Sequence, residues 1–147
     1  MKILTNTDIL TVPFGNIVHF VNCKGVWGAG LAAQMKQVHP EAFEKYKKDL
    51  TKENNPVFAL GSISQCKTKD GNKTIISCFT QYDTGVTSRK TEYSAVRSCF
   101  LTLSKLYGFG SNVYIPYEAG CGLGGGDWEI VSKIIERYLP DAILCKL

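Results

Sequence analysis

Short apolar runs, rich in β-branched and aromatic residues, alternate along the chain with longer amphipathic stretches. The run at residues 16–22 is almost uniformly apolar, which is typical of a strand covered on both faces. We expect the remaining strands at the other short apolar runs, namely residues 3–5, 58–65, 74–81, 112–117 and 142–145. Residues 70–72 (Asp-Gly-Asn) predict a hairpin turn between two of these strands.

Apolar residues at helical spacing fill most of the intervals between these strands. The predicted helices are residues 31–38, 41–50, 91–107 and 127–139, with Pro40 starting the second and Gly108 ending the third. The order of the elements predicts an α/β fold of three layers with a central mixed sheet. We find no linker, repeat or low-complexity segment, and therefore expect one domain over residues 1–147.

Two glycine-rich turns follow predicted strands and precede predicted helices. The first is residues 23–30, and the second is residues 120–128, which contain five glycines. Such a turn can hold an anion, because unpaired amide donors and the positive end of the helix dipole face the same point. Parallel strands would place both turns at the same edge of the sheet, where open α/β sheets bind ligands. We therefore predict that both turns hold phosphate.

Four polar side chains, three near strand or helix ends and one within a strand, are candidates for ligand contacts or chemistry. Asn22 ends the strand before the first turn, and its amide can donate to and accept from a ribose diol. Asp8 can either cap its own backbone or accept from an exocyclic amine such as that of adenine. His19, inside an apolar strand, is either a core residue or an acid or base. Lys90 lies at the predicted start of the third helix, where the dipole would favour a neutral amine, although a solvated side chain is the simpler interpretation.

Composition and charge exclude several classes of protein. A formal net charge of +4 is mild, and the lysines at residues 45–52 and 67–73 are not interleaved with aromatic residues as in a strand-binding groove. These lysines are more simply explained as solvated helix and hairpin faces. We identify no signal peptide and no run long enough to span a bilayer. These features predict a cytoplasmic protein with no membrane partner, and we expect a monomer.

The six cysteines are scattered, with no Cys-x-x-Cys pair and no histidine at ligand spacing. This arrangement favours free thiols in a reducing compartment and argues against a metal site or a disulfide framework. We therefore expect no metal, and the sequence suggests no other cofactor.

Three segments together resemble the macrodomain family: Asp8-Ile9, residues 22–34 and residues 120–128. The resemblance extends from Ile3 to the C-terminus, with both turns in the family's order and at its interval. It implies a three-layer α/β/α fold with a central mixed sheet and binding of ADP-ribose. The similarity is greatest to the subgroup of the terminal ADP-ribose–protein glycohydrolase, the antitoxin that reverses DNA ADP-ribosylation and the yeast-type ADP-ribose 1″-phosphate phosphatase.

The resemblance also implies roles for individual residues. Asp8 would take the adenine amine and Ile9 would add a backbone contact, while Asn22 and residues 25–30 would hold the distal ribose and residues 120–125 would wrap the diphosphate. The implied ligand-binding residues are Asp8, Ile9, Asn22, Gly25, Val26, Trp27, Gly28, Ala29, Gly30, Pro116, Glu118, Gly120, Cys121, Gly122, Leu123, Gly124 and Gly125.

For catalysis the resemblance implies Lys90, His19 and Asp127. Lys90, followed by Thr-Glu-Tyr, matches the glycohydrolase's Lys-x-x-Tyr and its catalytic lysine, and His19 matches the phosphatase's proposed catalytic histidine. The glycohydrolase has an aspartate directly after its Gly-Cys-Gly-Leu run, whereas this chain has Gly124, as antitoxin-like members do. Asp127 lies three residues further on, where we expect it to cap a helix.

The preferred prediction is a hydrolase that removes ADP-ribose from modified protein or nucleic acid through a lysine nucleophile. An ADP-ribose 1″-phosphate phosphatase is one alternative, and a non-enzymatic reader or sequestering module for ADP-ribose or a related nucleotide signal is another. A nicotinamide dehydrogenase is a weaker alternative. Residues 28–33 fit the loose Gly-x-Gly-x-x-Gly/Ala pattern, but the acidic strand end that should follow is missing.

Overall fold

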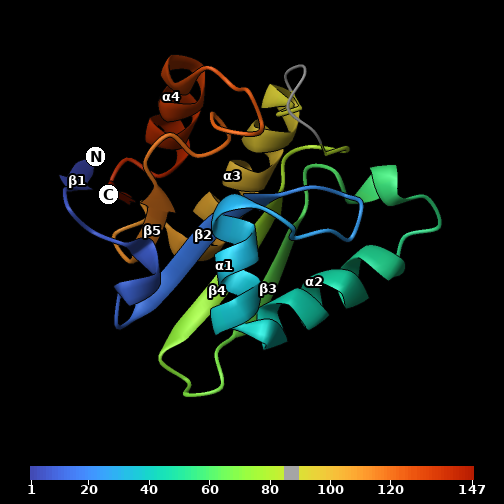
Figure 1. Cartoon of the computed structure of the whole chain (residues 1–147). Coiled ribbons are helices and arrows are strands. Elements are labelled where there is room, and N and C mark those ends of the chain that lie inside the picture. The colour runs from blue at the N-terminus through green and yellow to red at the C-terminus, as the bar shows by residue number, and fades with distance from the viewer. Residues whose placement is uncertain (85–89) are drawn as a thin grey trace.

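A mixed β-sheet lies at the centre of the computed structural model, which describes residues 1–84 and 90–147 (Figure 1). Strands and helices alternate along the chain, as the sequence predicts. The elements in chain order are β1 (Lys2–Leu4), the 3-10 helix η1 (Ile9–Thr11), β2 (Gly15–Val21), α1 (Gly30–Val38), α2 (Pro40–Thr51), the 3-10 helix η2 (Pro56–Ala59), β3 (Ile63–Lys67), β4 (Lys73–Phe79), α3 (Tyr93–Tyr107), β5 (Val113–Pro116), α4 (Trp128–Tyr138) and β6 (Ile143–Cys145).

Within the described residues, six strands form the sheet in the order β1-β6-β5-β2-β4-β3. All neighbouring pairs are parallel except β3 and β4, which form an antiparallel hairpin. Gly71 lies in the turn of this hairpin with φ +78°, a conformation that glycine adopts without strain. The predicted mixed sheet and the predicted turn at residues 70–72 are both confirmed.

Helices cover both faces of the sheet, α1 and α2 on one and α3 and α4 on the other (Figure 1). Successive side chains of β2 point to opposite faces, so Ile17 and Val21 pack with α1 and α2 while Val18 packs with α3 and α4. The same alternation in β4 packs Ile75 on the face covered by α1 and α2 and Ile76 on the face covered by α3 and α4. Burying each such side chain contributes about 1.5–3 kcal/mol, and the three predicted layers are confirmed.

Two predicted strands have wrong ends. Residues 58 and 59 belong to η2, because Asn55 accepts from the Val57 amide and Pro56 occupies the first helical position; β3 begins only at Ile63. At the same open end of the hairpin, β4 stops at Phe79, so that residues 80 and 81 lie beyond the strand. A short helical turn such as η2 carries no periodic signal, which explains why the start of β3 was predicted too early.

Helix α3 begins at Tyr93, with Glu92 as its N-terminal flanking residue. The helix thus begins two residues later than the predicted start at residue 91, and Lys90 lies three residues before its first residue. A helix dipole acts mainly within the first turn, so the argument for a neutral Lys90 amine loses its basis. By contrast, Asp127 caps α4 as predicted, since its side chain accepts from the Glu129 amide at 2.9 Å.

Strand β1 pairs with β6, which brings the two ends of the described chain side by side (Figure 1). Within residues 1–84 and 90–147, no helix has the length and apolarity needed to cross a membrane. The same residues contain no group of three or more His, Cys, Asp or Glu side chains that could hold a metal ion.

Candidate functional site

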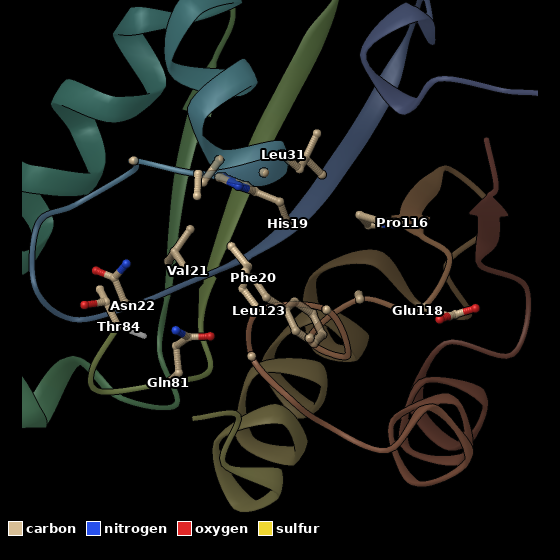
Figure 2. A pocket seen from close by; sticks show the side chains of 18 of the residues that line it. His19, Phe20, Val21, Asn22, Leu31, Gln81, Thr84, Pro116, Glu118 and Leu123 are labelled. Atoms are coloured by element: carbon tan, nitrogen blue, oxygen red, sulfur yellow. The ribbon is translucent and has the colours of Figure 1, made fainter. Parts of the chain in front are cut away.

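The two glycine-rich turns meet at one edge of the sheet because β2 and β5, the strands before them, are adjacent and parallel. They enclose a cavity of about 630 Å³, within the usual range for small-molecule sites. Figure 2 shows its side chains converging from β2, the two turns and the segment after β4. The lining residues are His19, Phe20, Val21, Asn22, Val26, Gly28, Ala29, Gly30, Leu31, Ala32, Gln81, Thr84, Pro116, Tyr117, Glu118, Ala119, Gly120, Gly122, Leu123 and Gly124.

Asn22 shapes the first turn through its own side chain. Its Nδ2 donates to the Val26 carbonyl at 2.6 Å, and its Oδ1 accepts from the Lys24 amide at 2.9 Å and from the Tyr46 hydroxyl at 3.0 Å. The same hydroxyl accepts from the Gly25 amide at 2.9 Å. Burial raises the pKa of Tyr46 to about 12, so this hydroxyl stays protonated. The turn is thus fixed to α2, which carries Tyr46.

The second turn is fixed by Thr91, whose side chain is fully buried. The Thr91 hydroxyl donates to the Gly120 carbonyl at 2.8 Å, and that carbonyl also accepts from the Gly126 amide at 2.8 Å. The Gly124 carbonyl accepts from the amides of Lys90, at 2.8 Å, and of Thr91, at 3.0 Å. This turn is therefore fixed to the segment that leads into α3.

Both turns present free amide donors to the cavity. In the second turn, the consecutive amides of Gly122, Leu123 and Gly124 donate no hydrogen bond within the described part of the chain. In the first turn, the residue before α1, Ala29, makes no side-chain cap, so the first amides of that helix also lack acceptors. Consecutive free amides of this kind form an anion-binding concavity.

The two helix starts are not equivalent, although the sequence suggested that they were. The start of α1 opens into the cavity through Gly30. The start of α4 is closed by the Asp127 side chain, and the Asp127 amide donates to the Tyr93 hydroxyl at 3.0 Å. At the second turn, the free amide donors on cavity-lining residues therefore belong to the turn itself and not to the start of α4.

His19 lies on the cavity wall but is almost fully buried, and burial lowers its pKa to about 3. Its Nε2 and the Ser77 hydroxyl are 2.7 Å apart, and its ring meets the Trp27 ring edge to face at 4.7 Å between centroids. The other nitrogen, Nδ1, has no partner within the described residues. At neutral pH this imidazole is uncharged.

Eight of the residues predicted to bind or react lie outside the cavity wall. Asp8 caps η1 by accepting from the Leu10 amide at 2.9 Å, which is the local role considered above, and Ile9 and Trp27 are buried in the core. Burial raises the pKa of the Cys121 thiol to about 11, so this group is not a nucleophile near neutral pH. The residues concerned are Asp8, Ile9, Gly25, Trp27, Lys90, Cys121, Gly125 and Asp127.

Sequence reasoning missed a third wall of the cavity, formed by Gln81 and Thr84 after β4. The signal was available, since a polar segment follows an apolar strand here just as it does at the other two turns. The missing information was that β4 is the parallel neighbour of β2, which brings its carboxyl end to the same edge. The other lining residues that were missed are Phe20, Val21, Leu31, Ala32, Tyr117 and Ala119.

The structure is an α/β protein in which a mixed sheet lies between two helical layers and two glycine-rich turns line one cavity. Residues 18–135 match the Macro domain family, and the chain belongs to this family. The predicted family and fold are thereby confirmed.

Relatives support this assignment. The chain is 30% identical over 137 residues to a DNA ADP-ribosyl glycohydrolase of Mycobacterium tuberculosis; the match covers 91% of this chain and 38% of that relative. The macrodomain of Mycobacterium tuberculosis DarG has a similar structure, with a TM-score of 0.77, 25% identity and coverage of 98% and 97% of the two chains. Thermosipho africanus DarTG, solved in complex with ADP-ribose, shares the fold with a TM-score of 0.75 and 21% identity, over 99% of this chain and 42% of that one.

Proposed function

We propose that this macrodomain binds ADP-ribose in the cavity and removes it from a modified substrate. The observation that carries the proposal is the pair of free amide runs, one from each turn, on the wall of a single cavity. A diphosphate between them would receive hydrogen bonds from both sides, and such charge-assisted bonds need no metal. A relative named as a DNA ADP-ribosyl glycohydrolase and a fold relative that binds ADP-ribose favour this ligand.

The proposed orientation follows from where polar groups lie on the wall. The diphosphate takes the amides of Gly122, Leu123 and Gly124, and the distal ribose takes the end that holds Asn22. One Nδ2 proton of Asn22 is used within the turn, which leaves the second to donate to a ribose hydroxyl. The amides are held in place before the ligand binds, so little reorganisation opposes charge development during reaction.

For the chemistry we propose Lys90 as the nucleophile. Its amide donates to the carbonyl of Gly124, a residue of the cavity wall, so its backbone adjoins the second turn and its flexible stem starts next to the site. The Lys90 ammonium first loses a proton to solvent; the amine then attacks the anomeric carbon of the distal ribose and gives up a second proton to water. The glycosidic bond breaks and its electron pair leaves with the carboxylate or base nitrogen. Water then adds to the sugar and releases the lysine.

Lys90→Ala tests this step against ADP-ribose attached to protein and to DNA. We expect turnover to fall by at least about 100-fold, as for loss of a catalytic group, with ADP-ribose affinity by calorimetry within about threefold of wild type. Lys90→Arg keeps the positive charge without a nucleophile and should be equally inactive. Lys52→Ala is the matched control, because Lys52 is an exposed lysine that directly follows α2 and is absent from the cavity wall. Undiminished turnover by Lys90→Ala would refute the proposed nucleophile.

A second candidate is a binding module without turnover. It is favoured by the position of Lys90 and Asp127 off the cavity wall and by the lack of any side chain at Gly124. Calorimetric binding of ADP-ribose with no product from either ADP-ribosylated substrate would select it.

The phosphatase has weaker support than either. An imidazole with a pKa near 3, such as that of His19, is a poor proton carrier at neutral pH. Phosphate release from ADP-ribose 1″-phosphate that is lost in His19→Ala would nevertheless establish it.

A further inference from the structure

Gln81 is held in place on the cavity wall by the backbone around it. The preceding residue, Thr80, is fully buried; its amide donates to the Val21 carbonyl, and its carbonyl accepts from the Glu92 amide at 2.8 Å. Gln81 itself forms an isolated antiparallel bridge with Thr91, the residue that fixes the second turn. The main chain of Gln81 is thus tied to the carboxyl end of β2 on one side and to the second turn on the other.

The side-chain amide of Gln81 has a defined orientation. Its Nε2 donates to the Asp83 carbonyl at 2.8 Å, which turns Oε1 the other way, to 3.1 Å from the point that a Cβ on Gly124 would occupy. Figure 2 shows the nitrogen on the side of Thr84 and the oxygen on the side of Leu123. Within the described chain, Oε1 accepts no hydrogen bond, so this cavity-lining residue has a lone acceptor beside Gly124 of the second turn.

This acceptor lies at the same end of the cavity as Asn22. The segments that carry the two residues are joined by the Thr80 amide bonded to the Val21 carbonyl and by the Cys23 amide bonded to the Tyr82 carbonyl at 3.0 Å. A carbonyl oxygen attracts hydroxyl and amine donors and repels other acceptors, including phosphoryl oxygens. The end of the cavity that holds Asn22 and Gln81 therefore suits a group that bears hydroxyls.

We propose that Gln81 is a specificity-determining residue, whose Oε1 accepts a hydrogen bond from a hydroxyl of the distal ribose. The inference rests on the proposed binding of ADP-ribose and adds the group that distinguishes this ligand from ADP, which lacks the distal sugar. Gln81 makes no contribution to diphosphate binding, because that is supplied by backbone amides of the two turns.

The test is calorimetric titration of wild type, Gln81→Ala and Gln81→Leu with ADP-ribose and with ADP. We expect both variants to bind ADP-ribose roughly 3- to 10-fold more weakly, the loss of one neutral hydrogen bond, and to bind ADP as wild type does. Leucine keeps most of the volume of the glutamine, so it serves where alanine perturbs the wall. Gln34→Ala, an exposed glutamine of α1 off the cavity wall, is the matched control and should change neither affinity.

The ratio of the two affinities separates the outcomes. A collapse of the wall in the variants would weaken ADP and ADP-ribose alike, leave the ratio unchanged and overturn the proposed role of Gln81. Unchanged ADP-ribose binding by both variants would overturn it as well. If wild type bound neither nucleotide, the proposed function would fail, and this inference with it.

Discussion

Gly124→Ala is expected to destabilise the protein, although the change adds only one methyl group. A Cβ at this position would lie 2.5 Å from the Thr91 hydroxyl and 2.7 Å from the Gly120 carbonyl oxygen, both closer than carbon and oxygen can approach. Neither atom can move freely, because the hydroxyl donates to that carbonyl and the carbonyl also accepts from the Gly126 amide. Relief of the clash must break at least one of these hydrogen bonds.

The magnitude follows from these contacts. Overpacking costs about 1–3 kcal/mol, and a broken hydrogen bond adds about 0.5–1.5 kcal/mol. Restricting the unfolded chain by replacing glycine with alanine returns about 0.4–1 kcal/mol. We therefore expect the free energy of unfolding to fall by about 0.5–4 kcal/mol. Gly122→Ala is the matched control, since a Cβ there would have no heavy atom within 4 Å and its φ is not positive.

The assay is urea unfolding followed by tryptophan fluorescence, with linear extrapolation to water. Gly122→Ala should leave the free energy of unfolding unchanged or raise it by up to about 1 kcal/mol, because only the unfolded-state entropy changes. The two variants thus differ in the sign of their effect. Equal unfolding free energies for Gly124→Ala and Gly122→Ala would refute the claim that Thr91 and the Gly120 carbonyl leave no room at position 124.

Two further predictions concern His19 and Asp127, for which the family resemblance implied catalytic roles. The pKa of His19 is depressed to about 3 in the fold, so its contribution to stability is complete above pH 6.5, the ordinary value, and is lost as the pH falls toward 3. Between pH 7 and pH 4.5 the free energy of unfolding, measured with urea, should fall more in wild type than in His19→Gln. The difference should grow by roughly 1.4 kcal/mol for each pH unit below 6.5. Parallel curves of unfolding free energy against pH would contradict the buried neutral imidazole. Asp127→Ala should lower the unfolding free energy by about 0.5–2 kcal/mol while Asp127→Asn, which retains the cap, should not. A loss of turnover in Asp127→Asn at normal stability would instead give this carboxylate a part in the reaction.

The turns themselves could be located from the sequence because their signals are local. Glycine clusters, the apolar run at residues 16–22 and the helical spacing after residue 128 each depend on neighbouring residues, and the parallel arrangement of the strands follows from their alternation with helices. The N-terminal cap at Asp127 was predictable for the same reason. A family resemblance that covers most of the chain added the ligand class.

Only the tertiary structure decided which groups face the cavity. Gln81 enters the wall because β4 pairs beside β2, and strand order is a long-range property with no local signal. Asp8 and Asp127 use their carboxylates on nearby amides, a choice between local and ligand hydrogen bonds that the residue type leaves open. Space at Gly124 depends on Thr91, a residue 33 positions earlier that packs against it. Sequence patterns set the elements and their turns, whereas the side chains that meet at the site come from contacts between segments distant in the chain.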